Sequence, residues 1–419
     1  MAIGQTAPTY FLVSPRPRIL VITSGPLCRN PRALKEASTL GAAGYDVTVA
    51  TVASHARFEA YDDAILDRAP FRKISVMHIP TSRKQHARKT LSRLQTWLAR
   101  RVVRYGFQTA QAFGPVAEMR RLALAHPADL TIVHTELGIA VGNILLKKGR
   151  CVATDVEDWH SEDLLPQERR HRPIRLLRGI EQRLLNHCTY TSTTSHALAN
   201  SLHARYGGQK PSVITNSFPL QPAPAHTGSN QPPQFFWFSQ TIGPGRGLEL
   251  FLAAWVRTQN PSRLVLLGEP RGGYREDLLN HIPAEYRDRV QFLPLVTTAE
   301  LPGVIAHHDI GLALEQPFIV NRDLTITNKI LQYLNAGLAV VASSTAGQRE
   351  VLAETPNAGI LVEAHETTAF ARALDDLLAD PASLAERQQA ARHLAESKYC
   401  WELEAPRLIA LVEAAVGSP

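Results

Sequence analysis

Apolar and polar positions along this chain follow two rhythms that alternate from near the start to the end. Short and nearly continuous apolar runs, such as residues 18–24 and 263–268, are typical of parallel strands buried on both faces. Between these runs, apolar residues recur every three or four positions, which predicts amphipathic helices. Strands and helices therefore alternate, and this favours an α/β fold of open, doubly wound parallel sheets.

The pattern predicts strands and helices in both halves of the chain. The predicted strands cover residues 18–24, 46–51, 74–79, 129–134, 151–155, 189–193, 235–239, 263–268, 290–295, 309–315, 338–343 and 359–363. The predicted helices cover residues 31–43, 88–125, 137–148, 173–187, 195–205, 366–396 with a break at Pro381, and 401–416.

Residues 206–234 interrupt the alternation, because they are rich in Gly, Pro, Gln and Ser. A chain of 419 residues also exceeds what one hydrophobic core usually supports, so we expect two Rossmann-like domains. Ligands bind at the carboxyl ends of strands in such sheets, and two domains that share a ligand must face each other across a cleft. The predicted division is a flexible tail at 1–17, an N-terminal domain at 18–210, a linker at 211–234, a C-terminal domain at 235–396, and a C-terminal helix at 397–419 that packs back towards the N-terminal domain.

Composition narrows the class of protein. No apolar run approaches the roughly 20 residues that span a bilayer, and the first residues do not have the pattern of a signal peptide. The four cysteines are far apart and fit no metal-ligand spacing, which favours a reducing, cytoplasmic location. The net charge of +7 suits a phosphate-rich ligand or an anionic surface, and no nucleic-acid-binding motif is present.

The segment FFWFSQTIGPGRGLE (235–249) carries the clearest chemical signal. A predicted strand leads into a glycine-containing loop with one cation, Arg246, and a helical pattern begins at Leu248. The positive end of a helix dipole and its free N–H groups attract anions, and small residues let the backbone approach them closely. The segment therefore predicts an anion site, although glycine here can also serve only to turn the chain.

Four segments in this order resemble glycosyltransferases of the GT-B fold, specifically the retaining family 4 enzymes. They are residues 24–51, 155–164, 239–249 and 327–343. The resemblance implies that a sugar moves from a UDP- or GDP-sugar to an acceptor hydroxyl with retention of configuration. It implies that the C-terminal domain binds the donor and the N-terminal domain the acceptor, which is a glycan, a lipid-linked glycan or a small molecule. It also implies no cofactor and no metal, and no Asp-x-Asp sequence stands in the predicted cleft loops.

The resemblance assigns donor contacts to the C-terminal domain. Arg246 stands where the family normally has a lysine that stabilises the leaving diphosphate, and Gly245 precedes it in the loop. The family's partner arginine corresponds to Gln240, so one positive charge is lost, and Lys329 beside Asn328 is the candidate that restores it. If Arg246 only closes a loop and Lys329 is solvated, neither residue binds the donor.

Two glutamates that the family places seven residues apart are replaced by Leu324 and Gln332. Gln332 can still bond a ribose hydroxyl, whereas a leucine cannot bond a sugar. Glu315, at the end of a predicted strand, and Asp323 are the carboxylates near enough to substitute, and we favour Glu315. These departures leave two alternatives open: a sugar-nucleotide epimerase and a non-catalytic GT-B subunit that binds or scaffolds.

Acceptor contacts are expected in the N-terminal domain. His134 matches a family histidine beside the reacting sugar, although a buried histidine with a structural partner is the plainer interpretation. The loop DVEDWHSED (155–163) offers Asp158 as a catalytic carboxylate, and its other acceptor contacts are Glu157, Trp159, with an apolar face for a sugar ring, and His160. Gly25 faces the cleft by topology and is expected to contact the donor, and Arg29 nearby is expected to contact an anionic acceptor.

The segment RKQHARKTLSRLQTWLARRVVR (83–104) is a basic amphipathic helix pattern, and a second basic group lies at 168–179. Such a helix can lie on an anionic membrane, so that the protein would be peripheral on the cytoplasmic membrane face. Alternatively, its apolar stripe packs into the domain and its charges are solvated. The sequence leaves both interpretations open.

Overall fold

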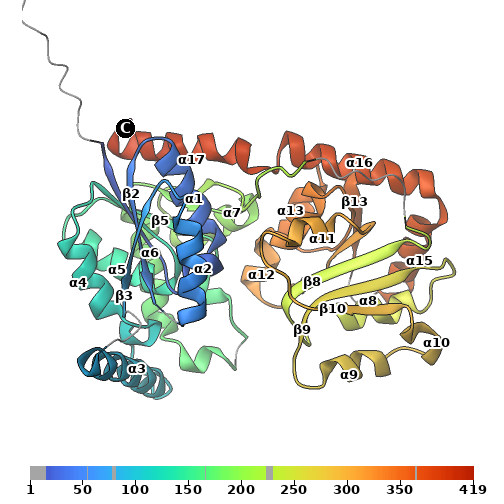
Figure 1. The fold of residues 1–419 in the computed structure, drawn as a ribbon, viewed down its shortest axis with the longest axis horizontal. Coiled ribbons are helices and arrows are strands. Elements are labelled where there is room, and N and C mark those ends of the chain that lie inside the picture. Colours follow the sequence, from blue (N-terminus) through green and yellow to red (C-terminus); the bar gives the residue numbers. More distant parts are fainter. Residues whose placement is uncertain (1–15, 54, 78–81, 166, 223–229, 364–365) are drawn as a thin grey trace, which may run out of the picture.

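The computed structural model describes residues 16–53, 55–77, 82–165, 167–222, 230–363 and 366–419. Two parallel sheets form two Rossmann-like domains that stand side by side (Figure 1). The N-terminal sheet has the order β3-β2-β1-β4-β5-β6-β7, and the C-terminal sheet has the order β10-β9-β8-β11-β12-β13. The predicted fold class, two doubly wound α/β domains, is confirmed.

The strands are short and mostly buried. In the N-terminal sheet they are β1 (Arg18–Ile22), β2 (Asp46–Val52), β3 (Arg72–Val76), β4 (Leu130–Val133), β5 (Val152–Val156), β6 (Thr191–Thr193) and β7 (Ser212–Val213). In the C-terminal sheet they are β8 (Gln234–Ile242), β9 (Arg263–Pro270), β10 (Val290–Leu293), β11 (Ile310–Ala313), β12 (Ala339–Ser343) and β13 (Gly359–Val362).

Helices cover both faces of each sheet. Those of the N-terminal domain are η1 (Leu27–Arg29), α1 (Pro31–Ala42), α2 (Ala56–Leu66), α3 (Arg83–Val103), η2 (Ala110–Phe113), α4 (Val116–Ala125), α5 (Thr135–Leu146), η3 (His160–Glu162), η4 (Arg169–His171), α6 (Ile174–His187) and α7 (His196–Tyr206). Those that follow are α8 (Leu248–Trp255), α9 (Tyr274–Asn280), α10 (Ala284–Arg287), α11 (Leu301–Ile305), α12 (Val320–Leu324), α13 (Asn328–Asn335), α14 (Ala346–Leu352), η5 (Pro356–Ala358), α15 (Thr367–Ala379), α16 (Pro381–Ser397) and α17 (Trp401–Val416).

The long helix predicted over 88–125 is wrong as a single element. The chain turns between α3 and α4 through Gly106 and Gly114, whose φ angles of 91° and 122° suit glycine. The side chain of Arg100 then donates a hydrogen bond to the carbonyl of Ala112, 3.0 Å away, and so joins α3 to the turn. The linker predicted over 211–234 includes the short strand β7, which pairs with β6. Its residues 223–229 lie outside the described part of the chain, as do residues 1–15 of the predicted tail.

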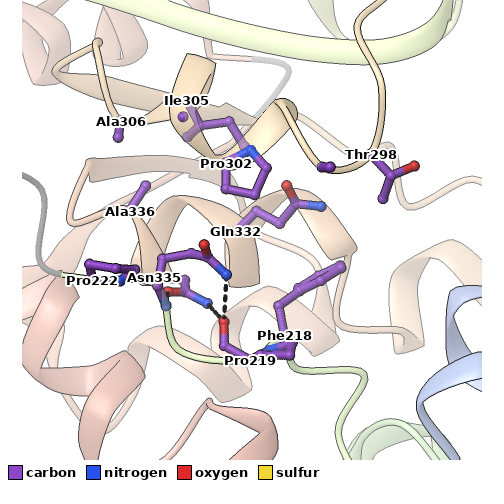
Figure 2. A pocket seen from close by; sticks show the side chains of 13 residues that line it. Phe218, Pro219, Pro222, Thr298, Pro302, Ile305, Ala306, Gln332, Asn335 and Ala336 are labelled. Atoms are coloured by element: carbon purple, nitrogen blue, oxygen red, sulfur yellow. Dashed lines mark hydrogen bonds between the residues drawn. The ribbon is translucent and has the colours of Figure 1, made fainter. Parts of the chain in front are cut away.

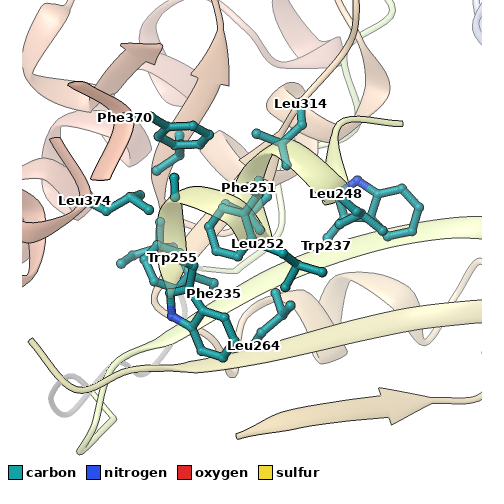
Figure 3. Close-up of a cluster of buried hydrophobic side chains, with 14 of the residues drawn as sticks. Phe235, Trp237, Leu248, Phe251, Leu252, Trp255, Leu264, Leu314, Phe370 and Leu374 are labelled. Carbon is teal, nitrogen blue, oxygen red and sulfur yellow. The ribbon is translucent and has the colours of Figure 1, made fainter. Parts of the chain in front are cut away.

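Large aromatic side chains build the core beneath α8 in the C-terminal domain. Phe235 and Trp237 of β8 are fully buried. Phe235 lies edge-on to Phe251 of α8 with 5.1 Å between ring centres, and Trp237 lies beside Leu248 (Figure 3). The indole N–H of Trp255 donates to the hydroxyl of Ser262, 2.8 Å away, so its one polar group is satisfied. This packing holds α8 against β8 and fixes the direction in which its N-terminus points.

The C-terminal helix α17 lies on the N-terminal domain, although α16 before it covers the C-terminal domain (Figure 1). The indole N–H of Trp401 donates to the hydroxyl of Thr39 in α1 at 2.8 Å, and Leu408 and Val412 are buried in the same core as β1. Near the end of the chain, the hydroxyl of Tyr45 donates to the carbonyl of Gly417 at 3.1 Å. The chain therefore crosses between the two domains twice.

Candidate active site

The loop between β8 and α8 is shaped by Gly247. This glycine is the N-cap of α8 with a φ of 80°, and a Cβ at this position would lie 2.4 Å from the carbonyl oxygen of Leu314. Only glycine therefore lets the start of α8 come so close to the end of β11. No side chain caps α8, so its first N–H groups point into the region beside Arg246 and Glu315. Gly245 also has a positive φ, 73°, but open space surrounds it.

Lys329 and Glu315 form a buried ion pair at the N-terminus of α13. The Lys329 Nζ lies 2.5 Å from Glu315 Oε1, and each side chain is only about a tenth exposed. Burial acts to raise the pKa of Glu315, but its pKa lies below the usual value because Lys329, Arg246 and Arg322 outweigh this effect with their charges. Arg246 is half-buried and close enough for Glu315 to sense its charge, so the three residues form one cluster.

Gln240 of the C-terminal domain contacts the N-terminal domain directly. Its side-chain oxygen accepts a hydrogen bond from the guanidinium of Arg29, whose other face lies 5.3 Å from the ring centre of Phe58. Arg29 was expected to contact an acceptor. The structure instead places its charge at the position where the resemblance implies an arginine of the C-terminal domain.

A cavity of about 520 Å³ opens along the same face of α13 as Lys329, one to two turns further on. Figure 2 shows Gln332 and Asn335 of this helix and Ala336 just after it on one wall, and Pro302 and Thr298 on the opposite wall. Asn335 donates to the carbonyl of Pro219 at 2.9 Å, which holds the residues after β7 against the cavity. The Oε1 of Gln332 is buried and has no hydrogen-bond partner in the described part of the chain. An unpaired buried acceptor is costly unless a ligand donates to it.

Asn216 joins the two domains behind this cluster. Its amide nitrogen lies 3.0 Å both from Oε1 of Glu157 and from Oδ1 of Asn328, and its oxygen accepts from Lys35 at 2.8 Å. Burial raises the pKa of Glu157 to about 7, with help from the charges of Asp158 and Asp155. Burial likewise lowers the pKa of Lys35 to about 7. Asn216 therefore holds Glu157 of the N-terminal domain and Asn328 of the C-terminal domain together.

His134 lies in a buried polar network. Its Nε2 is 2.5 Å from the carboxylate of Glu36, and Arg32 holds Asp155 at 2.7 Å beside it. Although burial favours the neutral ring, Glu36 and Asp155 raise the pKa of His134. The side chain is 2% exposed, which agrees with the interpretation of a buried histidine with a structural partner. Its contact with a sugar stays a prediction.

The loop 155–163 is locked to the C-terminal domain by Asn321. The amide of Asn321 donates to Asp158 at 2.8 Å and to Asp163 at 2.9 Å, and its oxygen accepts from the backbone N–H of Trp159 at 2.7 Å. Burial and the charge of Asp158 raise the pKa of Asp163 to about 6. Asp158 is thus engaged by the other domain rather than free in the cleft.

The expectation that Trp159 offers a face to a sugar ring is wrong. Trp159 is 6% exposed, and its ring lies edge-on to Tyr206, 6.0 Å between centres, within an apolar cluster. Leu324 of the C-terminal domain packs against the same cluster, so the residue that replaces a family glutamate has a structural role. His160 is half-buried and forms no ion pair or hydrogen bond among the described residues, and its contact with an acceptor stays a prediction.

Gly25 has a φ of 75° in the loop after β1. Asn30 is the N-cap of α1, but its side chain does not cap the helix. It accepts a hydrogen bond from the hydroxyl of Thr23 at 3.1 Å and donates to the carbonyls of Ser24 at 3.0 Å and Pro26 at 2.6 Å. Asn30 therefore stabilises the loop that carries Gly25, because its side-chain amide bonds backbone carbonyls on both sides of this glycine.

Sequence reasoning missed Asn216, Asn321 and Lys35. Two of them are single asparagines in segments without a periodic pattern, and their partners stand more than 50 positions away along the chain. Only the three-dimensional structure brings such pairs together. In the described ranges, no group of three or more His, Cys, Asp or Glu side chains is arranged to hold a metal ion. No described helix is long and apolar enough to cross a membrane.

Comparison with solved structures identifies the fold as that of two-domain GT-B glycosyltransferases. The structure of Anabaena Alr3699/HepE in complex with UDP and glucose has a TM-score of 0.68 at 17% identity, covering 95% of this chain and 100% of that chain. Sucrose-phosphate synthase from Thermosynechococcus elongatus has a TM-score of 0.66 at 15% identity, covering 95% and 98%. WaaG, a glycosyltransferase involved in lipopolysaccharide biosynthesis, has a TM-score of 0.61 at 12% identity, covering 94% and 99%.

Residues 232–380 match the family model described as glycosyl transferases group 1. No curated protein sequence matches the chain. The matched segment contains Arg246, Glu315, Lys329 and Gln332, and the resemblance to GT-B glycosyltransferases is therefore confirmed for the domain that carries this cluster.

Proposed function

We propose that this protein is a retaining glycosyltransferase that transfers a hexose from a nucleotide-sugar donor to an acceptor hydroxyl, without a metal. The observation that carries the proposal is the ion pair of Lys329 with Glu315, set beside Arg246 within the segment that matches the glycosyltransferase family. Lys329 and Arg246 both act on Glu315 with their charges, and α8 begins two residues after Arg246 without a side chain that caps its first N–H groups. This arrangement suits the diphosphate of a leaving nucleotide.

The donor is expected to lie along one face of α13. Its diphosphate would sit at Lys329 and Arg246, and its ribose at Gln332, whose unpartnered Oε1 can accept from a hydroxyl. The base would then enter the cavity beyond Gln332. We favour UDP over GDP, because Alr3699/HepE, which shares the fold, was solved with UDP and glucose.

In the proposed reaction, the bond between the anomeric carbon and the β-phosphate oxygen breaks. The acceptor hydroxyl oxygen forms a bond to that carbon from the same face, and its proton passes to the leaving phosphate oxygen. Negative charge grows on the diphosphate during this step, so the cations act where they stabilise the transition state most. Glu315 orients Lys329 by its hydrogen bond and does not receive a proton in this scheme.

A panel of nucleotides measured by thermal shift, followed by hydrolysis of the matching sugar nucleotide, tests the proposal. We expect UDP to raise the melting temperature by an amount that corresponds to about 2.7 kcal/mol at a hundredfold excess over Kd. Arg246→Gln should raise the Kd for UDP about tenfold or more and so lower this stabilisation by about 1.4 kcal/mol or more. Arg257→Gln, which changes an exposed arginine just after α8, should not change it.

Each other result contradicts the proposal in its own way. UDP binding without hydrolysis or transfer would favour a non-catalytic subunit, which the replacements Gln240, Leu324 and Gln332 motivate. An altered sugar nucleotide as product would favour an epimerase. Loss of activity when a metal chelator is added would contradict the proposal that the transfer needs no metal. If no nucleotide stabilises the protein, the assignment of the cleft is wrong.

A further inference from the structure

Helix α3 attaches to the N-terminal domain through its small and polar side. The residues that it buries are Lys89, Ser92, Ala99 and Val103, which recur at three, seven and four positions along one side of the helix. Large apolar side chains do not hold this helix in place. The interpretation that its apolar stripe packs into the domain is therefore wrong.

The apolar stripe instead faces solvent. Leu91, Leu94, Leu98 and Val102 are between 39% and 55% exposed, and their positions place them on the side of the helix opposite the buried residues. The stripe continues into Tyr105, which is 82% exposed. Figure 1 shows α3 at the edge of the N-terminal domain, away from α17. A continuous apolar surface of this kind marks a place where the protein meets another phase or partner.

Positive charge surrounds the stripe. Residues 83–104 contain six arginines and no aspartate or glutamate. The guanidinium of Arg101 lies 4.3 Å from the ring centre of Trp97, which is itself 49% exposed. An aromatic ring with a cation over it, beside leucines and arginines, has the composition of a helix that lies in a lipid–water interface.

A cavity of about 510 Å³ adjoins the C-terminal end of α3 and is lined by five arginines. They are Arg104, Arg169, Arg170, Arg172 and Arg175. Arg169 pairs with Glu162 at 3.0 Å and Arg172 pairs with Glu136, whereas the other three have no carboxylate within ion-pairing distance in the described ranges. Burial and the charge of Arg100 lower the pKa of Arg172, as expected in a strongly positive environment. Guanidinium groups gathered in this way suit a phosphate group.

We propose that α3 and this arginine cavity form one docking surface for an anionic lipid bilayer. The stripe from Leu91 to Tyr105 would enter the boundary between head groups and acyl chains, and the cavity would hold a lipid phosphate. The occupant is a bilayer rather than a protein because the stripe follows the helix axis and residues 83–104 carry arginines but no aspartate or glutamate, so the charge of the helix complements an anionic surface. This inference goes beyond the proposed function, since it needs no nucleotide and no reaction.

The surface is joined to the acceptor side of the predicted site through two carboxylates. Glu162 pairs with Arg169 and with Arg178, 2.7 Å away, and belongs to the same short helix as His160. Glu136 pairs with Arg172 and lies in the first turn of α5, two residues after His134. A lipid-linked acceptor at the bilayer would therefore enter from this side, and this extension alone rests on the proposed function.

Co-sedimentation of the full chain with vesicles tests the surface, without any nucleotide present. We expect binding to phosphatidylcholine vesicles that contain phosphatidylglycerol, weaker binding at high salt, and little binding to phosphatidylcholine alone. Leu94→Ser with Leu98→Ser should lower the partition constant about tenfold or more, because these side chains would no longer enter the interface. Arg170→Gln with Arg175→Gln should lower it about 25-fold, or about fivefold for each charge.

Matched control variants lie on the C-terminal domain. Leu361→Ser changes a leucine that is 41% exposed, and Arg257→Gln with Arg287→Gln removes two exposed arginines. These controls should bind vesicles as the parent protein does, and all variants should keep its melting temperature, because the changed side chains are exposed.

Three results would overturn the proposal. The first is no binding to anionic vesicles at low salt, and the second is equal loss in the control variants. The third is a change of sedimentation coefficient in the absence of vesicles when Leu94 and Leu98 are replaced, because the stripe would then join copies of the protein. Failure of sugar transfer with intact vesicle binding would contradict the proposed function and leave this surface in place.

Discussion

The guanidinium of Arg29, in the N-terminal domain, donates a hydrogen bond to the side-chain oxygen of Gln240, in the C-terminal domain. The resemblance to family 4 enzymes implies an arginine at position 240, and the hydrogen bond brings the charge of Arg29 to the glutamine that stands there. Arg29 also lies over the ring of Phe58, which fixes its direction. The charge of Arg29 therefore lies at Gln240 only while the two domains are in contact.

If the proposed function holds, Arg29→Gln is expected to weaken binding of UDP about tenfold, because the positive charge that Arg29 holds at Gln240 is lost. Titration calorimetry of the variant against the parent protein measures the effect. The double variant Arg29→Gln with Gln240→Arg returns the charge to the other domain and should restore most of the affinity. Arg57→Gln removes a charge from the neighbouring helix α2, and equal weakening there would show that only net charge matters.

Glu315→Gln is expected to destabilise the protein by about 3 kcal/mol, since it leaves the buried ammonium of Lys329 without its carboxylate. Urea unfolding measures the change. The pKa of Glu315 is lowered by folding, so its stabilising effect is complete above its usual value of 4.5 and is lost as the pH falls through the lower folded value. The difference between variant and parent should therefore shrink below pH 4.5.

The control for this prediction is Glu354→Gln. Glu354 pairs with Lys398, but the two side chains are 56% and 31% exposed. An exposed pair contributes at most about 1 kcal/mol, so this variant should unfold nearly as the parent protein does. Similar losses in both variants would mean that burial of the Lys329 pair is not what makes it important.

Gly247→Ala should be far more damaging than Gly245→Ala, although both glycines have a positive φ. Each substitution costs about 1 kcal/mol from the backbone conformation alone. At Gly247 the new Cβ would also lie 2.4 Å from the carbonyl oxygen of Leu314, and α8 must move away from β11 to make room. Calorimetry should show a loss of more than about 3 kcal/mol for Gly247→Ala. A loss equal to that of Gly245→Ala would contradict the close approach.

The pH dependence of stability should change in Glu157→Gln. Folding raises the pKa of Glu157 from 4.5 to about 7, so the folded protein binds this proton more tightly, and stability falls as the pH rises between these values. In Glu157→Gln this decrease in stability, which amounts to about 3 kcal/mol at most, should be absent. Melting temperatures from pH 4.5 to 8 measure it, with the exposed Glu285→Gln as the control.

Lys35 is expected to change stability with pH in the opposite direction to Glu157, and at higher pH. Folding lowers its pKa from 10.5 to about 7, so the folded protein binds this proton more weakly, and stability rises with pH from about 7 towards 10.5. Lys35→Met should remove this rise. If the pH profiles of the two variants match the parent protein, then Asn216 does not hold Glu157 and Lys35 in the buried arrangement described above.

The donor side of the site could be predicted from the sequence in good part. Gly247, Arg246 and the start of α8 follow one another along the chain, and Lys329 and Gln332 share one helix face, so local geometry alone places them together. The pair of Glu315 with Lys329 also follows from a strand end and a helix start that neighbour each other in this fold. Such patterns cannot predict which distant residue a side chain contacts.

The acceptor side shows this limit. Trp159 and His160 are adjacent in the chain, yet one is inside an apolar cluster and the other is half-buried. His134 ends a strand as expected, but Glu36 reaches it from a helix that lies almost 100 positions away. The burial of these side chains depends on what packs over them, and that is decided by contacts between distant segments.

The sequence by itself determined the alternation of strands and helices, the two parallel sheets and the glycine-containing loop before α8, because these depend on periodicity and on local backbone conformation. Only the tertiary structure decided that Asn321 and Asn216 join the domains, that Arg29 contacts Gln240, and that the leucines of α3 face outward. An amphipathic pattern states that a helix has an apolar side. It does not state which side the protein covers, because that depends on the shape and chemistry of the surface against which the helix packs.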